Sequence, residues 1–208
     1  ESASEVIGFT TAIAPVVGFE VESADLYPGD SAVFTWTPNT RNLMGYNMYQ
    51  DGVLLNTELI TANRYVVNNL EHNLTPGYNF QITSVYTEGE SAPSAAINVR
   101  MAGNGTVSGT VFEQDSITPV ANASVRLQGT DVYGASQSYT FTTDATGIYT
   151  GEVIEGNYVA VASKDGYQNC AYDGTLEVVY DLITYNANIY LYEVYAPLGQ
   201  IIATEQEE

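Results

Sequence analysis

The chain has 208 residues, room for one large or two ordinary domains, and 45% of them are hydrophobic, which is enough to bury real cores and argues against intrinsic disorder. Its 25 acidic side chains against 5 Lys and Arg give a net charge of -20, which excludes nucleic acid as a partner and disfavours an anionic membrane surface. Every apolar run is far shorter than the roughly 20 residues of a membrane-spanning helix, so no membrane insertion is expected.

Residue types that carry catalysis are scarce. The single cysteine, Cys170, cannot form an internal disulfide, and the single histidine, His72, cannot build the usual zinc cluster. Acid pairs such as Glu88 with Glu90 fall at turns without an evident cleft. Because an enzyme needs a nucleophile with a base, a carboxylate pair or a metal, we predict a noncatalytic protein without a cofactor.

The start of the chain bears on where the protein works. It begins at Glu1 without an initiator Met, a basic region or an apolar signal core, so we expect a removed signal peptide or an excised piece. The strongly acidic composition suits a solvated surface. We therefore expect an extracellular or cell-surface location.

Short segments near the two ends of the chain resemble other segments of it. Residues 1–7 resemble residues 90–97, and residues 196–199 resemble residues 14–18. This predicts that residues 1–13 are a strand of a preceding module and that 196–208 start a following module or form a tail. Chance matches in a biased composition are one alternative. Another is that 1–13 is a donor strand that pairs with an open sheet edge of another chain.

The first half of the sequence predicts an all-β domain, because short runs of β-branched and aromatic residues end at Gly, Pro, Asn or Asp. Asp51-Gly52 is a strong hairpin signal, and Pro76-Gly77 predicts a further turn. The small residues at 102–105 mark a domain boundary, so the first domain spans 14–102. The expected strands are 17–21, 32–37, 45–49, 53–57, 64–67, 78–87 and 96–101.

The second half repeats this pattern and predicts a second sandwich over 103–195. No window in either half keeps a helical apolar stripe, so no substantial helix is expected. The fold class is therefore all-β, with two tandem immunoglobulin-like or transthyretin-like sandwiches. The expected strands are 106–112, 123–127, 138–143, 147–153, 157–163, 176–179 and 186–192.

The first domain resembles a fibronectin type III module. The resemblance is carried by Trp36, by the segment 45–52, by Leu74-Thr75-Pro76-Gly77 and by the segment 88–94. The wording of these segments is similar to that of modules in large secreted bacterial adhesins and peptidases. Trp36 alternates with Phe34 on one face, so both are expected to fill the space between the sheets. The family's tyrosine-corner position holds Phe80, with Tyr78 nearby.

The second domain resembles a carboxypeptidase regulatory-like domain, a transthyretin-like sandwich. Its matching segments are 105–111, 119–125, 143–149, 156–161 and 166–167. Asp144 with Gly147, and then Gly156-Asn157, are expected to form hairpin turns. Tyr149, Tyr158 and Val161 are expected to face a core. The resemblance implies no peptidase activity, because the zinc ligands of those enzymes lie in another domain.

Two kinds of weak binding candidate stand beside simpler interpretations. Loops with Asp25, Asp30, Glu113 and Asp115 supply the oxygens that Ca²⁺ prefers, although solvated acids are the simpler interpretation. The chain has 17 tyrosines, which crowd its final third, and an exposed aromatic face can stack on a sugar ring. Tyrosine is also a strong strand former. The candidate ligand-binding residues are Tyr172, Tyr180 and Tyr185.

The function that the sequence favours is a pair of noncatalytic structural or adhesion modules of a secreted or surface-displayed bacterial protein. Its expected partners are a protein or glycan at the cell surface, or copies of itself. One alternative is a subunit of an extracellular filament assembled by strand pairing. The other is a carbohydrate-binding accessory region of a larger hydrolase.

Overall fold

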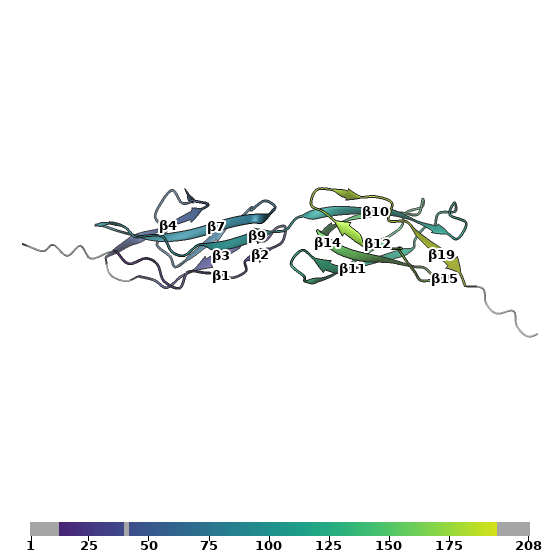
Figure 1. The fold of residues 1–208 in the computed structure, drawn as a ribbon, viewed down its shortest axis with the longest axis horizontal. Helices are drawn as coiled ribbons and strands as arrows, with labels where there is room; N and C mark the ends of the chain where they lie inside the picture. Colours follow the sequence, from purple (N-terminus) through teal and green to yellow (C-terminus); the bar gives the residue numbers. More distant parts are fainter. Residues whose placement is uncertain (1–12, 40–41, 195–208) are drawn as a thin grey trace, which may run out of the picture. The chain divides into compact units, whose positions relative to one another are not determined.

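The computed structural model describes residues 13–39 and 42–194, and every regular element within them is a β-strand (Figure 1). The chain divides into two compact units between Gly103 and Asn104, one residue beyond the expected boundary. Each unit is a sandwich of two sheets, so the predicted all-β fold with two tandem sandwiches is confirmed. The expectations for residues 1–13, of which the structure describes only residue 13, and for residues 196–208 lie outside the described residues. In the described ranges no helix is long and apolar enough to cross a membrane.

Unit 1 packs a small sheet against a large one. The small sheet is antiparallel, in the order β1 (Glu20–Val21), β3 (Ala32–Thr35), β6 (Arg64–Val67). The large sheet has the order β2 (Asp25–Leu26), β9 (Ile97–Met101), β7 (Asn73–Tyr86), β4 (Leu43–Gln50), β5 (Val53–Leu54), with β8 (Gly89–Glu90) on β7. The expected Asp51-Gly52 turn joins β4 to β5, with both residues at positive φ (50° and 81°).

Aromatic side chains fill the space between the two sheets of unit 1. Phe34 and Trp36 are buried, as expected from their alternation along the strand. The Phe34 ring lies 4.7 Å from that of Phe80, and the Trp36 ring meets Tyr46 edge-on at 5.1 Å. Such tilted and edge-on pairs are favoured over face-to-face stacking. The core is therefore held by rings from both sheets.

One expectation for the segment before Phe80 is corrected. Pro76-Gly77 does not form a turn ahead of a strand, because β7 runs through it with a register shift against β9 between Asn73 and Tyr78. The Thr75-Pro76 bond is cis, and Gly77 takes a φ of 79°. The hydroxyl of Tyr78, two residues before Phe80, donates to the carbonyl of Glu71 at 3.2 Å.

Unit 2 has two sheets of similar size. The first has the order β13 (Ile148–Ile154), β10 (Asn104–Glu113), β19 (Ile189–Glu193), β15 (Tyr167–Gln168), with β18 (Ile183–Thr184) beside β10. The second has the order β12 (Ser136–Thr142), β11 (Ser124–Asp131), β14 (Gly156–Ser163), β16 (Cys170–Ala171), with β17 (Leu176–Val178) beside β14. The chain therefore passes from one sheet to the other between β15 and β16.

The expected hairpins of unit 2 are instead crossings between its sheets. Gly147 does close a turn onto Asp144, with its N–H 3.1 Å from that carbonyl oxygen. The strands on either side, β12 and β13, belong to different sheets. The same is true at Gly156, where β13 ends and β14 begins in the other sheet. A local turn signal fixes the bend but not the sheet that the next strand joins.

The core of unit 2 contains tyrosines whose hydroxyls are satisfied. Tyr149 and Tyr158 are buried as expected, and they donate to the carbonyls of Ala187 (2.6 Å) and Ile154 (2.8 Å). Burial raises the pKa of Tyr149, so its hydroxyl remains a donor. Val161 does not join this core. Residues an odd number apart on a strand face opposite ways, and the inward positions after Tyr158 are alanines.

We expect Gly109→Ala to destabilise unit 2 by about 1–3 kcal/mol. A Cβ at this position would lie 2.2 Å from the carbonyl oxygen of Ala187 and 2.8 Å from the Tyr149 hydroxyl, so β10 and the segment before β19 would have to separate. Urea unfolding measures the change in free energy. Ser136→Thr, which adds one methyl group at an exposed site on β12, is the matched control. Equal stability of the two variants would contradict the expectation.

Candidate functional site

The calcium candidates of unit 1 are engaged within the protein. Asp25 pairs with Arg100 across β2 and β9, with 2.6 Å between Nη2 and Oδ1. Asp30 accepts the N–H of Tyr27 at 3.0 Å through Oδ2 and so closes the turn between them. Both carboxylates therefore have a structural partner that explains their position.

The calcium candidates of unit 2 are engaged in the same way. Glu113 accepts the hydroxyl of Tyr167 at 2.8 Å. Asp115 accepts the hydroxyl and N–H of Thr118 and the N–H of Ile117. These bonds, that of the Thr118 hydroxyl first, hold the pKa of Asp115 below its ordinary value. Within 13–39 and 42–194, no three His, Cys, Asp or Glu side chains are placed to hold a metal ion together.

One of the three tyrosine candidates lies in a groove of unit 2. Tyr172, which is half-buried against the core, lines a hollow of about 400 Å³ together with Tyr190 and Tyr192 of β19. We call this hollow the tyrosine groove. Tyr180 and Tyr185 are not among its lining residues, and both are exposed. Its other lining residues are Cys170, Ala171, Asp173, Asn186 and Asn188.

The groove follows from the sheet crossing between β15 and β16. β15 covers the outer edge of β19 only at Tyr192 and Glu193. The chain then leaves as β16, which pairs with β14 in the opposite sheet. The edge of β19 around Tyr190 is therefore left beside a gap between the two sheets. Tyr190 and Tyr192 belong to the tyrosines that crowd the final third but are not among the candidate residues, although their spacing of two residues on one strand places both rings on one face.

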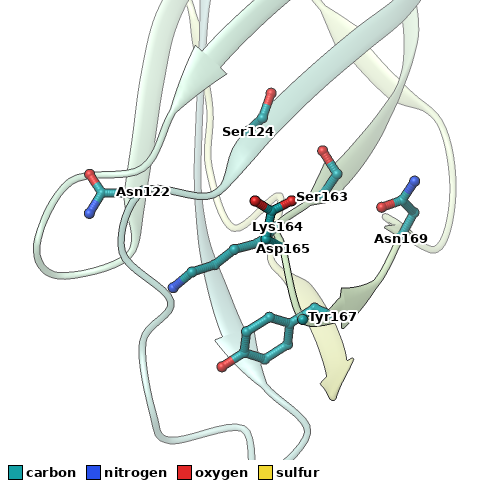
Figure 2. Close-up of a pocket in the computed structure, with 8 residues that line it drawn as sticks. Asn122, Ser124, Ser163, Lys164, Asp165, Tyr167 and Asn169 are labelled. Atoms are coloured by element: carbon teal, nitrogen blue, oxygen red, sulfur yellow. The ribbon is translucent and has the colours of Figure 1, made fainter. Parts of the chain in front are cut away.

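A second hollow of unit 2, of about 600 Å³, is polar (Figure 2). Lys164, the only lysine of the chain, extends above the ring of Tyr167, with its Nζ 5.6 Å from the ring centroid. That is a cation–π distance, and it gives this cation a role within the unit. Asn122, Ser124, Ser163, Asp165 and Asn169 complete the wall.

Unit 1 has a hollow of about 330 Å³ beside Glu90. The Oε1 atom of Glu90 accepts hydrogen bonds from the Asn47 amide (3.0 Å), the Tyr49 hydroxyl (2.8 Å) and the Thr83 hydroxyl. The bond from Thr83 contributes most to holding the pKa of Glu90 below its ordinary value, against the effect of burial. Burial, and then Glu90 itself, raise the pKa of Tyr49. This carboxylate fastens β8 to the face of the large sheet.

Comparison with known proteins gives likeness only at the level of solved structures. No protein-family model matches the chain, and no curated protein matches it. The Bacillus anthracis TIE protein is similar over 93% of this chain and 42% of its own, at 12% identity and a TM-score of 0.39. BcpA, the major pilin subunit of Bacillus cereus, is similar over 87% and 71%, at 12% identity and a TM-score of 0.37. Fibronectin(III)-like modules of Clostridium thermocellum CbhA are similar over 85% and 93%, at 12% identity and a TM-score of 0.34. The chain thus spans less than half of the TIE protein.

Millimolar Ca²⁺ is expected to leave the midpoint of thermal unfolding unchanged when ionic strength is held constant. The four candidate carboxylates already have partners in the protein, and a ligand raises stability only when it binds the folded state preferentially. Calorimetry with CaCl₂, with EDTA and with NaCl at equal ionic strength checks this, because screening of the net charge alone raises stability in all salts. A saturable rise specific to Ca²⁺ would show a site.

Glu90→Gln is expected to destabilise unit 1 at neutral pH and to lose this effect in acid. The folded state holds the pKa of Glu90 below its ordinary 4.5, so its stabilisation is complete above that pH and disappears as the pH falls through the folded pKa. Urea unfolding of the wild type and of Glu90→Gln at several pH values gives the difference in their free energies of unfolding. Taking this difference cancels the loss of charge repulsion that acidification causes in both proteins. Exposed Glu88→Gln is the control. A difference that persists at about pH 2 would refute this role for the charge.

Proposed function

We propose that the chain is a pair of noncatalytic structural and adhesion modules of a secreted or surface-displayed bacterial protein, and that each sandwich carries tension along the chain. The observation that supports this most is shared by the two units. In each, a strand near its start pairs in parallel with its last described strand. A protein or glycan at the cell surface, or further copies of the chain, would be the partner that applies the tension.

In unit 2 the pair is β10 with β19. The N–H groups of Val111 and Glu113 donate to other segments, so Phe112 between them directs its N–H and C=O toward β19. Asn188 adds a side-chain link, since its Oδ1 accepts the N–H of Thr110 at 2.9 Å. The register joins Val111 to Ile189, Phe112 to Tyr190 and Glu113 to Leu191.

In unit 1 the pair is β2 with β9. The N–H of Arg100 donates to Ala24 at 2.7 Å, and the N–H of Ala102 donates to Leu26 at 2.9 Å. The ion pair of Arg100 with Asp25 spans the same two strands. Because both side chains are about two-fifths exposed, the ion pair adds little stability of its own, and the backbone bonds are the main connection.

Parallel pairing matters because of the direction in which tension acts. Pulling a unit by its two ends draws the early strand backward and the last strand forward. In a parallel pair this is shear along the strands, so the interstrand bonds are stretched together rather than opened one after another. Each hydrogen bond contributes only about 1 kcal/mol net, but bonds that must break together raise the barrier to forced unfolding jointly.

We further infer that unit 1 is a fibronectin type III module and unit 2 a carboxypeptidase regulatory-like domain. Buried Trp36 and the hydrogen bond from the Tyr78 hydroxyl to Glu71 support the first assignment. The turn from Asp144 to Gly147 and the buried Tyr149 support the second, because they fall on the residues that carry that resemblance.

Single-molecule stretching of the whole chain by its ends tests the mechanical proposal. Phe112→Pro removes the N–H that faces β19, so it is expected to lower the unfolding force of unit 2 and leave that of unit 1 unchanged. Unit 1 thus serves as the internal reference. Asn188→Ala, which removes only the side-chain link to Thr110, is the milder second variant should the proline prevent folding.

Thr140→Pro is the matched control, because edge strand β12 pairs with β11 through its odd-numbered residues and the N–H of Thr140 points out of the sheet. Urea unfolding gives the equilibrium cost of each variant, expected at about 1–3 kcal/mol for Phe112→Pro. If Phe112→Pro and Asn188→Ala lower stability but leave the unfolding force of unit 2 intact, the parallel pair does not resist tension.

A further inference from the structure

We propose that the tyrosine groove of unit 2 binds a neutral carbohydrate. The groove lies between β19 and the segment that follows β16, and its volume of about 400 Å³ falls in the range of small-ligand sites. Three tyrosines, two asparagines and one aspartate are among the residues that line it. Rings that meet the C–H face of a sugar, beside amides and a carboxylate that bind its hydroxyls, form the lining that such a ligand needs.

The rings of Tyr190 and Tyr192 are available, and those of Tyr190 and Tyr172 are packed against neighbouring side chains. Tyr190 and Tyr192 are 40% and 44% exposed, whereas the alternate residues Ile189 and Leu191 point into the core. The ring of Phe112 stacks behind Tyr190 at 6.0 Å, and Tyr172 packs on the core from the opposite side. Side chains that are fixed before binding lose little entropy when a ligand arrives.

The polar groups are placed to bind hydroxyls. Asn188 accepts the N–H of Thr110 through Oδ1, which fixes its amide and leaves its NH₂ group as a donor. Because Phe112 makes the bonds between β10 and β19, Tyr190 directs its own N–H and C=O to the opposite edge, beside the groove. Asn186 and the carboxylate of Asp173 complete the polar lining.

Charge selects a neutral ligand over an acidic one. No Lys or Arg lines the groove, its one charge is that of Asp173, and the chain carries a net charge of -20, so uronic or sulfated sugars are repelled. A quaternary ammonium ligand needs rings that converge into a box. Here Tyr190 and Tyr192 point outward from β19 whereas Tyr172 packs against the core, and among the described aromatic pairs none joins these three rings to one another.

The same geometry disfavours a peptide strand. Strand addition takes its affinity from a row of backbone bonds along an open edge. Here β15 already pairs with β19 at Tyr192 and Glu193, and the N–H of Asn188 donates to Asn186. The open edge is therefore confined to Tyr190, which suits a compact ligand.

The test is a titration of the whole chain, isotope-labelled at tyrosine, followed by NMR. The neutral probes are cellohexaose, maltohexaose and mannohexaose, and the comparison probes are hexagalacturonate, choline and an uncharged extended octapeptide. At least one neutral probe is expected to shift the ring signals of Tyr190 and Tyr192. Tyr192→Ala is expected to weaken that binding by about tenfold or more, through loss of an exposed ring.

Tyr185→Ala is the matched control, because this ring is 66% exposed and lies outside the lining. Its affinity should equal that of the wild type. Asp173→Asn, which keeps the size of the side chain, supplies a second variant with weakened binding. The proposal is overturned if no neutral probe shifts these signals at millimolar concentration, if Tyr185→Ala and Tyr192→Ala weaken binding equally, or if hexagalacturonate, choline or the octapeptide binds there more tightly.

Discussion

The parallel contact between β10 and β19 decides how unit 2 is built. It needs a residue without a side chain at the point of closest approach. Gly109 is that residue, since a Cβ there would lie 2.2 Å from the carbonyl oxygen of Ala187. That approach also brings Ala187 within reach of the Tyr149 hydroxyl at 2.6 Å. A buried tyrosine is stable only when its hydroxyl is bonded, so the strand contact and the core depend on one another.

The tyrosines of unit 2 divide into two populations by the face of the strand they occupy. Tyr149 and Tyr158 point inward and donate to backbone carbonyls, so their hydroxyls are used within the fold. Tyr190 and Tyr192 point outward from a strand whose alternate residues are fully buried. The abundance of tyrosine therefore reflects both strand formation and an exposed aromatic surface, and strand register decides which role each residue takes.

Much of the fold could be predicted because period-two patterns and turn residues are local. The range 64–67 agrees with β6, and Asp51-Gly52 forms the predicted hairpin turn. Strands of two residues, such as β15 and β16, were missed because they carry no pattern long enough to detect. The hairpin expected at Gly156 was wrong for another reason. The sheet that a strand joins depends on the packing of the whole core and not on the local turn residues. The groove was only partly predicted, since it exists where β15 and β16 join different sheets.

The two proposals for unit 2 meet at Phe112 and Tyr190. These residues are partners in the parallel register, and their rings stack at 6.0 Å. Shear of β10 past β19 separates them, so Tyr190, which lines the tyrosine groove, loses the ring that is stacked on it. A sugar that binds only the intact groove stabilises the folded unit by mass action. Attachment through the groove and resistance to tension along the chain therefore reinforce one another, because both require the same pair of strands to stay in register.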